Sequence, residues 1–172
     1  MQNNINDELL DLVDQHDHVI GVLERSQVYA MHHNNFRVIN CFISNDIGQL
    51  WIPRRAAHKK LFPLALDVSV GGHVVSGETY DEAFVRELYE EVGLRDQQIA
   101  YRKIGSMSPH EHGVSAFMHV YHVRYNETPP FNHDDFIEYY WLYPNEVLEK
   151  IAQGDMAKSD LPILIQYFFM YF

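Results

Sequence analysis

Residues 72–94 read GHVVSGETYDEAFVRELYEEVGL, and this stretch carries the strongest structural signal in the chain. Thr79, with Glu82 three residues later, forms a capping box, a pattern that begins many helices. Gly93 stands where a left-handed residue commonly ends a helix. We therefore predict a helix over residues 80–92.

One side of this predicted helix carries three carboxylates. Glu87, Glu90 and Glu91 are spaced i, i+3 and i+4, so a helix of about 3.6 residues per turn gathers them on one patch. They would repel one another unless a cation neutralised them, and clustered carboxylates are ligands that Mg²⁺ and Mn²⁺ prefer. Apolar residues beside them recur every four positions and should pack against a sheet: Phe84, Leu88 and Val92. The pattern indicates a metal site at the edge of a sheet.

The spacing resembles the Nudix box, G-x5-E-x7-R-E-U-x-E-E-x-G-U, where U is aliphatic. Every defined position is matched: Gly72, Glu78, Arg86, Glu87, Leu88, Glu90, Glu91, Gly93 and Leu94. The resemblance implies an α/β fold, a Nudix-type α/β/α sandwich with a mixed sheet and a loop-helix-loop box. It also implies hydrolysis of a phosphoanhydride bond in a nucleoside-diphosphate-linked or other organic diphosphate.

The resemblance further implies roles for single residues. Mg²⁺ or Mn²⁺ would be bound by Glu87, Glu90 and Glu91, with the carbonyl of Gly72. Supporting positions beside these ligands would be filled by Glu78 and Arg86. The general base varies in this family, so Glu87, Glu111 and Asp135 are all candidates, and Glu91 is counted among the catalytic residues.

The chain before the box resembles the branch that contains isopentenyl-diphosphate isomerase, through His33, Arg54-Arg55 and LFPLALDVSVGGHV at 61–74. The isomerase needs a cysteine where this chain has Gly71, and Cys41 is expected to be a buried strand residue. A hydrolase is therefore the first expectation. A catalytically idle module that binds a nucleotide or diphosphate is one alternative, and the isomerase is another.

Three residues outside the carboxylate patch are candidates for substrate binding. Arg54 and Arg55 end a predicted strand, where a guanidinium could bond phosphate oxygens, although a surface pair beside Lys59 and Lys60 is the alternative. His73 could contact phosphate, bind metal or be a hydrogen-bonded loop residue. The histidines of the sequence His110-Glu111-His112 could bind a transition metal, but a solvated loop tip is the simpler interpretation.

The expected elements alternate between strands and helices. We predict a hairpin of strands 9–13 and 19–24, a short helix over 26–32, and further strands over 37–44, 50–54, 66–70, 101–106, 114–125 and 137–142. Helices over 144–153 and 160–172 follow. The whole chain, 1–172, should be a single domain with residues 1–30 as an N-terminal extension.

Composition restricts the partners. The chain has 172 residues and a net charge of −11, which disfavours binding to nucleic acid polymers or anionic membranes. Its single cysteine and the lack of a leader pattern favour a cytoplasmic protein. The aromatic C-terminal tail could form a homodimer contact, although burial within the fold is simpler.

Overall fold

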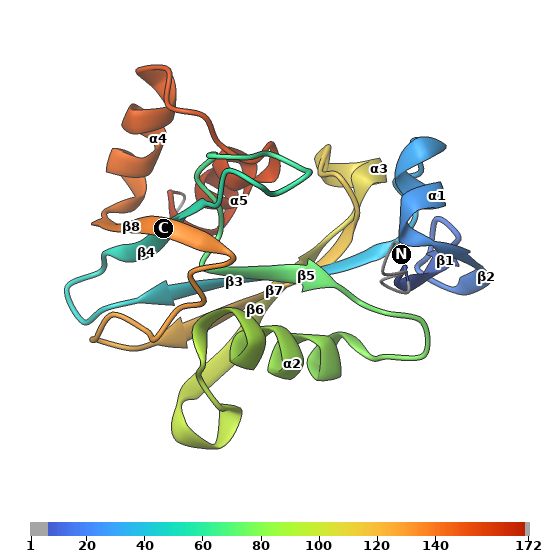
Figure 1. The fold of residues 1–172 in the computed structure, drawn as a ribbon, viewed down its shortest axis with the longest axis horizontal. Coiled ribbons are helices and arrows are strands. Elements are labelled where there is room, and N and C mark those ends of the chain that lie inside the picture. Colours follow the sequence, from blue (N-terminus) through green and yellow to red (C-terminus); the bar gives the residue numbers. More distant parts are fainter. Residues whose placement is uncertain (1–6, 171–172) are drawn as a thin grey trace, which may run out of the picture.

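The computed structural model describes residues 7–170, and its centre is a mixed six-stranded sheet (Figure 1). Strands follow the order β6-β7-β3-β4-β8, with β5 paired to β3. The strands of this sheet are β3 (Arg37–Ser44), β4 (Leu50–Arg55), β5 (Val70–His73), β6 (Ala100–Met107), β7 (Phe117–Arg124) and β8 (Phe136–Leu142). A separate hairpin is formed by β1 (Leu9–Val13) and β2 (Val19–Glu24). The helices are α1 (Arg25–Ala30), α2 (Tyr80–Val92), α3 (Pro109–His112), α4 (Pro144–Ala152) and α5 (Asp160–Phe169), with a 3-10 turn at Asp96–Gln98.

Helices cover both faces of the sheet, so the predicted α/β/α sandwich is confirmed (Figure 1). Side chains alternate along a strand. On β3, Ile39, Cys41 and Ile43 pack in the cluster that contains the apolar face of α2. Phe42 points the other way, into the cluster formed by α4 and α5. His119 and His122 on β7 likewise face opposite layers, because His119 stacks on Tyr80 of α2 and His122 lies near Phe169 of α5.

Strand β3 pairs differently on its two edges. One edge pairs with β7 in parallel over its full length, while the other pairs with β5 at Val38–Cys41 and with β4 only at Ser44. Where β3 and β4 diverge, the Ser69 hydroxyl accepts from the Ile43 N–H at 2.8 Å and donates to the Trp51 carbonyl at 2.6 Å. A side chain thus replaces ladder hydrogen bonds between the two strands.

This divergence explains the main correction to the predicted elements. The strand expected over 66–70 begins only at Val70 and runs to His73. Leu66 instead forms isolated bridges to Arg54 and Ala157. The strand predicted from residue 114 begins at Phe117. The last helix ends at Phe169, and the predicted tail residues Tyr171 and Phe172 lie outside the described residues, as do the first six of the predicted extension.

The described part of the extension packs beside the sheet through a third apolar cluster. Leu10 of β1 and Val28 of α1 are buried there with Phe36 and Ala116. This cluster holds the hairpin and α1 next to the end of β5 (Figure 1). Within residues 7–170, no helix is long and apolar enough to cross a membrane.

His119 provides a test of this packing. Its ring stacks on Tyr80 at 3.7 Å between centroids, and its Nδ1 is buried with no hydrogen-bond partner among the described residues. Burial lowers its pKa from 6.5 to about 4, and the charge of Lys103 adds to this effect. Because the unfolded chain takes up this proton first, the stability contribution should be complete above pH 6.5 and be lost as the pH falls to about 4. In His119→Gln, the loss of unfolding free energy between these two pH values should shrink by about 1–2 kcal/mol, allowing for partial exposure.

Chemical denaturation of both proteins across this pH range measures the difference. The exposed His16→Gln should follow the wild-type pH dependence. An unchanged pH dependence in His119→Gln would show that this histidine is not held neutral by the fold.

Candidate active site

A cavity of about 860 Å³ lies where the N-terminal end of β3, β5 and α2 meet. On one side it is lined by the α2 carboxylates and the β5 turn: Glu87, Glu90, Glu91, Gly71, Gly72 and His73. The remaining wall includes four cationic side chains from distant parts of the chain: Arg25, Arg55, Lys59 and Lys158. Glu8, Asp135 and Asp160 also line that wall. We call the α2 carboxylates the acidic side of the cavity and the wall with the four cations its basic side.

Local sequence places α2 as predicted. The Thr79 hydroxyl accepts from the Glu82 N–H at 3.2 Å, and the Glu82 carboxylate accepts from the Thr79 N–H at 2.8 Å. Gly93 ends the helix with a φ of 65°. The predicted apolar face, Phe84, Leu88 and Val92, is fully buried against the sheet. The carboxylates beside this face consequently lie at the cavity edge.

Two of these carboxylates are largely withdrawn from water. Glu91 accepts a hydrogen bond from the Gly71 N–H at 2.9 Å, and its pKa is raised well above the ordinary value, first by burial and then by the charge of Glu87. Burial also raises the pKa of Glu87 to about 7, although Arg86 opposes this. Glu90 remains 56% exposed. Such a pair of buried acids is poorly stabilised by the protein alone.

Gly72 allows a very close approach between α2 and β5. A Cβ atom built on this glycine would overlap the carboxylate of Glu87. With this carboxylate in its present position, only a residue without a side chain fits beside it. The glycine that the box requires is thus explained by the packing of the helix carboxylate.

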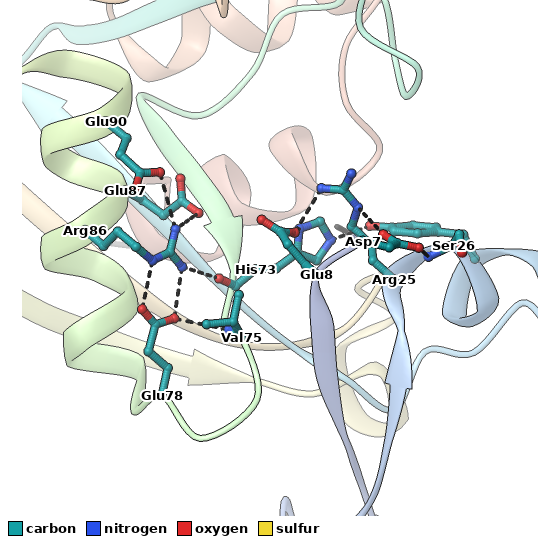
Figure 2. A network of polar contacts seen from close by, with 11 residues as sticks. Asp7, Glu8, Arg25, Ser26, His73, Val75, Glu78, Arg86, Glu87 and Glu90 are labelled. Atoms are coloured by element: carbon teal, nitrogen blue, oxygen red, sulfur yellow. Dashed lines mark hydrogen bonds and ion pairs between the residues drawn. The ribbon is translucent and has the colours of Figure 1, made fainter. Parts of the chain in front are cut away.

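Arg86 connects the box residues to one another (Figure 2). Its guanidinium donates to both oxygens of Glu78 at 2.8 and 2.9 Å, to Glu87 at 2.7 Å and to the His73 carbonyl at 2.9 Å. Glu90 is more distant, at 3.5 Å. These contacts raise the pKa of Arg86, with the hydrogen bond to Glu78 the largest cause. Arg86 therefore holds the helix and the β5 turn in one arrangement.

The acidic side fits a divalent cation in the chemistry of its donors. Its carboxylate oxygens are hard ligands suited to Mg²⁺ or Mn²⁺. In the present side-chain positions of residues 7–170, no three His, Cys, Asp or Glu groups converge closely enough to enclose an ion. Arg86 contacts one oxygen of Glu87, and the Gly71 N–H contacts one of Glu91.

His73 is anchored by the N-terminal extension (Figure 2). The Tyr29 hydroxyl lies 2.8 Å from Nε2, and a Glu8 oxygen lies 3.7 Å from Nδ1. The ring of Phe36 stacks on the imidazole, with 5.9 Å between the ring centroids. Burial lowers the pKa of His73 to about 3, and the charges of nearby cations add to this effect. This surrounding matches the alternative of a hydrogen-bonded histidine, although His73 ends strand β5 and does not lie in a loop.

The two arginines at the end of β4 differ in position. Arg55 lines the cavity, where it donates to Asp67 at 2.7 Å and to the Leu61 carbonyl at 3.1 Å. Arg54 is not among the lining residues. Its guanidinium donates to Asp155 at 2.8 and 3.0 Å and also pairs with Glu138. The structure thus brings only Arg55 to the place predicted for both.

The two candidate bases outside α2 also differ in their position relative to the cavity. Asp135 lines the cavity and forms an ion pair with Lys59. The loop that carries Asp135 is held against α2, because the Asn132 N–H donates to the Glu91 carbonyl at 2.8 Å. Glu111 is exposed on α3 and is not among the lining residues.

The histidines flanking Glu111 have separate partners. His110 lies 2.9 Å from Asn35, whereas His112 accepts from the Ser108 N–H at 3.1 Å. The arrangement suits the solvated tip rather than a metal cluster.

Sequence reasoning missed Glu8, Arg25, Tyr29 and Lys158 as lining residues and left Lys59 as a surface alternative. These residues come from segments with no recognisable motif, and only tertiary contacts bring them to the cavity. The signal that could have drawn attention to them is charge. Four of the 13 lysines and arginines of an acidic chain line one cavity.

Comparison with known proteins gives consistent results. The profile described as NUDIX domain matches residues 34–164. An uncharacterized Nudix hydrolase of Nostoc sp. is 51% identical over 162 residues, covering 94% of this chain and 96% of that protein. A crystal structure of a Deinococcus radiodurans protein superposes with a TM-score of 0.91 at 46% identity, covering 94% of this chain and 99% of the other. An isopentenyl-diphosphate Delta-isomerase of Klebsiella pneumoniae is 28% identical over 160 residues, covering 89% and 85% of the two chains.

The Arg86 contacts lead to a stability prediction. Removing this cation in Arg86→Gln leaves Glu78 and Glu87, both mostly buried, without their charged partner. The free energy of unfolding should fall by about 2–3 kcal/mol, less than for a fully buried pair because Arg86 is 27% exposed. Urea denaturation at neutral pH measures the change.

Arg124→Gln is the matched control, because its ion pair with Asp46 is exposed on both sides. It should change the unfolding free energy by less than about 0.5 kcal/mol. Equal effects of the two substitutions would contradict a structural role for the Arg86 contacts.

Proposed function

Because this chain belongs to the Nudix hydrolase family, whose members are pyrophosphohydrolases acting on phosphorus-containing anhydrides, we propose that it is metal-dependent and cleaves an organic diphosphate. The substrate would be a nucleoside-diphosphate-linked compound or another small molecule that contains a phosphoanhydride bond. The proposal extends the family assignment to a cofactor and a substrate class. A cytoplasmic location stays a prediction from the sequence.

The observation that carries the proposal is the burial of Glu87 and Glu91 beside a cavity. Their raised pKa values reflect negative charges that the surrounding protein does not fully compensate. A divalent cation would remove this deficit and would turn the acidic side into a surface that attracts phosphate. Glu87, Glu90 and Glu91, with the Gly72 carbonyl, would hold it. When bound, such an ion supplies Lewis-acid stabilisation of phosphate oxygens and a lowered pKa for water.

The other cavity residues would bind and orient the substrate. Arg55 and Lys59 line the cavity from segments outside α2, and their cationic groups suit phosphate oxygens. Arg86 and Glu78 would hold the helix carboxylates and the β5 turn in their present relative positions. His73, enclosed by its own partners, would fix the backbone of that turn.

We assign the general base to Asp135. It lines the cavity on a loop outside α2, so its carboxylate is not needed in the proposed ligand set. Glu87 and Glu91 would be engaged with the ion. Glu111 lies away from the cavity and is set aside.

The isomerase alternative is not supported by the position of the only cysteine. Cys41 is fully buried on the α2 side of β3, and burial raises the pKa of its thiol. Gly71, in the place where the isomerase needs a thiol, offers none. An idle binding module is disfavoured because the three carboxylates proposed as metal ligands, Glu87, Glu90 and Glu91, all line the cavity.

The metal ligands are tested by the double substitution Glu90→Gln with Glu91→Gln. Removing two of three carboxylates should lower kcat on a hydrolysed diphosphate by at least about a thousandfold, since the ion supplies several kcal/mol of stabilisation. Phosphate or monophosphate release with Mg²⁺ or Mn²⁺, and its loss in EDTA, measures this. Circular dichroism checks that the variant is folded.

Glu149→Gln, on the exposed side of α4, is the control and should retain wild-type turnover. Undiminished metal-dependent hydrolysis in the double variant would refute the ligand assignment. Binding of diphosphates by the wild type without turnover of any would favour the idle module.

The base is tested by Asp135→Asn. Loss of a positioned general base should lower kcat by about 10² to 10⁴ while leaving KM within a fewfold. The adjacent Asp134→Asn should have little effect, because Asp134 is exposed and does not line the cavity. A kcat reduced less than about tenfold in Asp135→Asn would shift the role to a carboxylate of α2.

A further inference from the structure

Lys158 lies just before α5, far in sequence from the box, yet the fold tethers it to the cavity wall. Its N–H donates to the Leu66 carbonyl at 2.9 Å, and the Leu66 N–H donates to the Met156 carbonyl at 2.8 Å. Leu66 also bridges to Arg54 of β4. Residues 156–158 thus lie beyond Leu66 on the side of β4 that faces away from β8, and Lys158 lines the cavity from there.

The four cavity cations differ in their partners. Three have a carboxylate within 3 Å: Arg25 has Glu8 at 2.9 Å, Arg55 has Asp67 at 2.7 Å, and Lys59 has Asp135. The Lys158 ammonium is 3.6 Å from its carboxylate, Asp67, which is longer than a hydrogen bond. Across the described part of the chain, its Nζ makes no hydrogen bond, so three donors are available to a ligand.

Asp67 does not depend on Lys158. One oxygen of this buried carboxylate accepts from Arg55, and the other accepts from the Val68 N–H at 2.8 Å. Both oxygens are satisfied without a second cation. The ammonium is therefore an additional positive charge in a mostly buried position, 26% exposed, beside a cavity.

We propose that Lys158 binds a phosphate group of the substrate at a subsite on the part of the cavity wall outside α2. Arg55 would contribute its second terminal nitrogen, which makes no hydrogen bond within the described residues. The proposal rests on the proposed hydrolase function. Phosphate oxygens supply the acceptors that the Lys158 ammonium lacks, and Asp67 keeps Arg55 and Lys158 near each other. A plain salt bridge between Lys158 and Asp67 is the opposing interpretation.

The first test is binding of inorganic pyrophosphate in EDTA, measured by isothermal titration calorimetry. Wild-type protein should bind, and Lys158→Gln should raise the Kd by about tenfold or more, the size expected for a charge-assisted hydrogen bond. Lys158→Arg, which keeps the charge, should restore most of the affinity. Lys60→Gln removes the same charge from an exposed position next to Lys59 in the sequence, and this variant should bind pyrophosphate like the wild type.

The second test is kinetic, on any diphosphate that the wild type hydrolyses. Lys158→Gln should raise KM by a similar factor with kcat within about threefold, and should lessen the dependence of kcat/KM on salt. A purely structural salt bridge would leave KM unchanged in Lys158→Gln.

The outcomes separate the two proposals. No pyrophosphate binding by the wild type, or equal binding by wild type and Lys158→Gln, overturns the subsite whether or not hydrolysis occurs. Loss of affinity in Lys158→Gln supports it even where no diphosphate is turned over, a result that would overturn the proposed function alone.

Discussion

The close approach of α2 to the β5 turn is the constraint on which the site depends. Glu87 fits beside Gly72 only because that residue has no side chain, and Glu91 is fixed by the Gly71 N–H. The apolar face of the same helix is buried one position away, so the helix cannot rotate to expose these carboxylates without losing its core contacts. Packing therefore holds two carboxylates in partly buried positions, where binding of a cation becomes favourable.

Other features of the fold follow from this contact. The turn must lie near α2, so β5 takes the edge of β3 that β4 would otherwise occupy, and β4 pairs with β3 only at its end. Ser69 supplies hydrogen bonds across the resulting gap. The divergence also leaves room for the Ala65–Asp67 segment between β4 and residues 156–158, and Asp67 of this segment lies between Arg55 and Lys158 on the basic side. The acidic side and the Arg55–Lys158 part of the basic side thus both follow from one departure from regular pairing.

The acidic side could be predicted from sequence, whereas the basic side could not, for a physical reason. Helix periodicity and capping act over a few residues, so the positions of Glu87 and Glu91 relative to the core were readable from the local pattern. Arg54 and Arg55 are adjacent on β4, so strand alternation alone sends them to opposite faces, but which face holds the cavity depends on tertiary packing. Lys158 reaches the cavity because residues 156–158 form backbone hydrogen bonds with Leu66, a long-range contact that no local sequence pattern predicts.

The net charge of −11 gains a structural meaning from this division. A uniformly acidic protein would repel diphosphates, yet four of its 13 basic side chains gather on one cavity wall, and three of them are already paired. The pairing keeps those cations ordered and limits their free charge. In the proposed enzyme, attraction of phosphate would then come mainly from the ion held by α2 and from Lys158. Binding would be strongest for a molecule whose phosphates meet both sides of the cavity at once, which favours a diphosphate over a single phosphate.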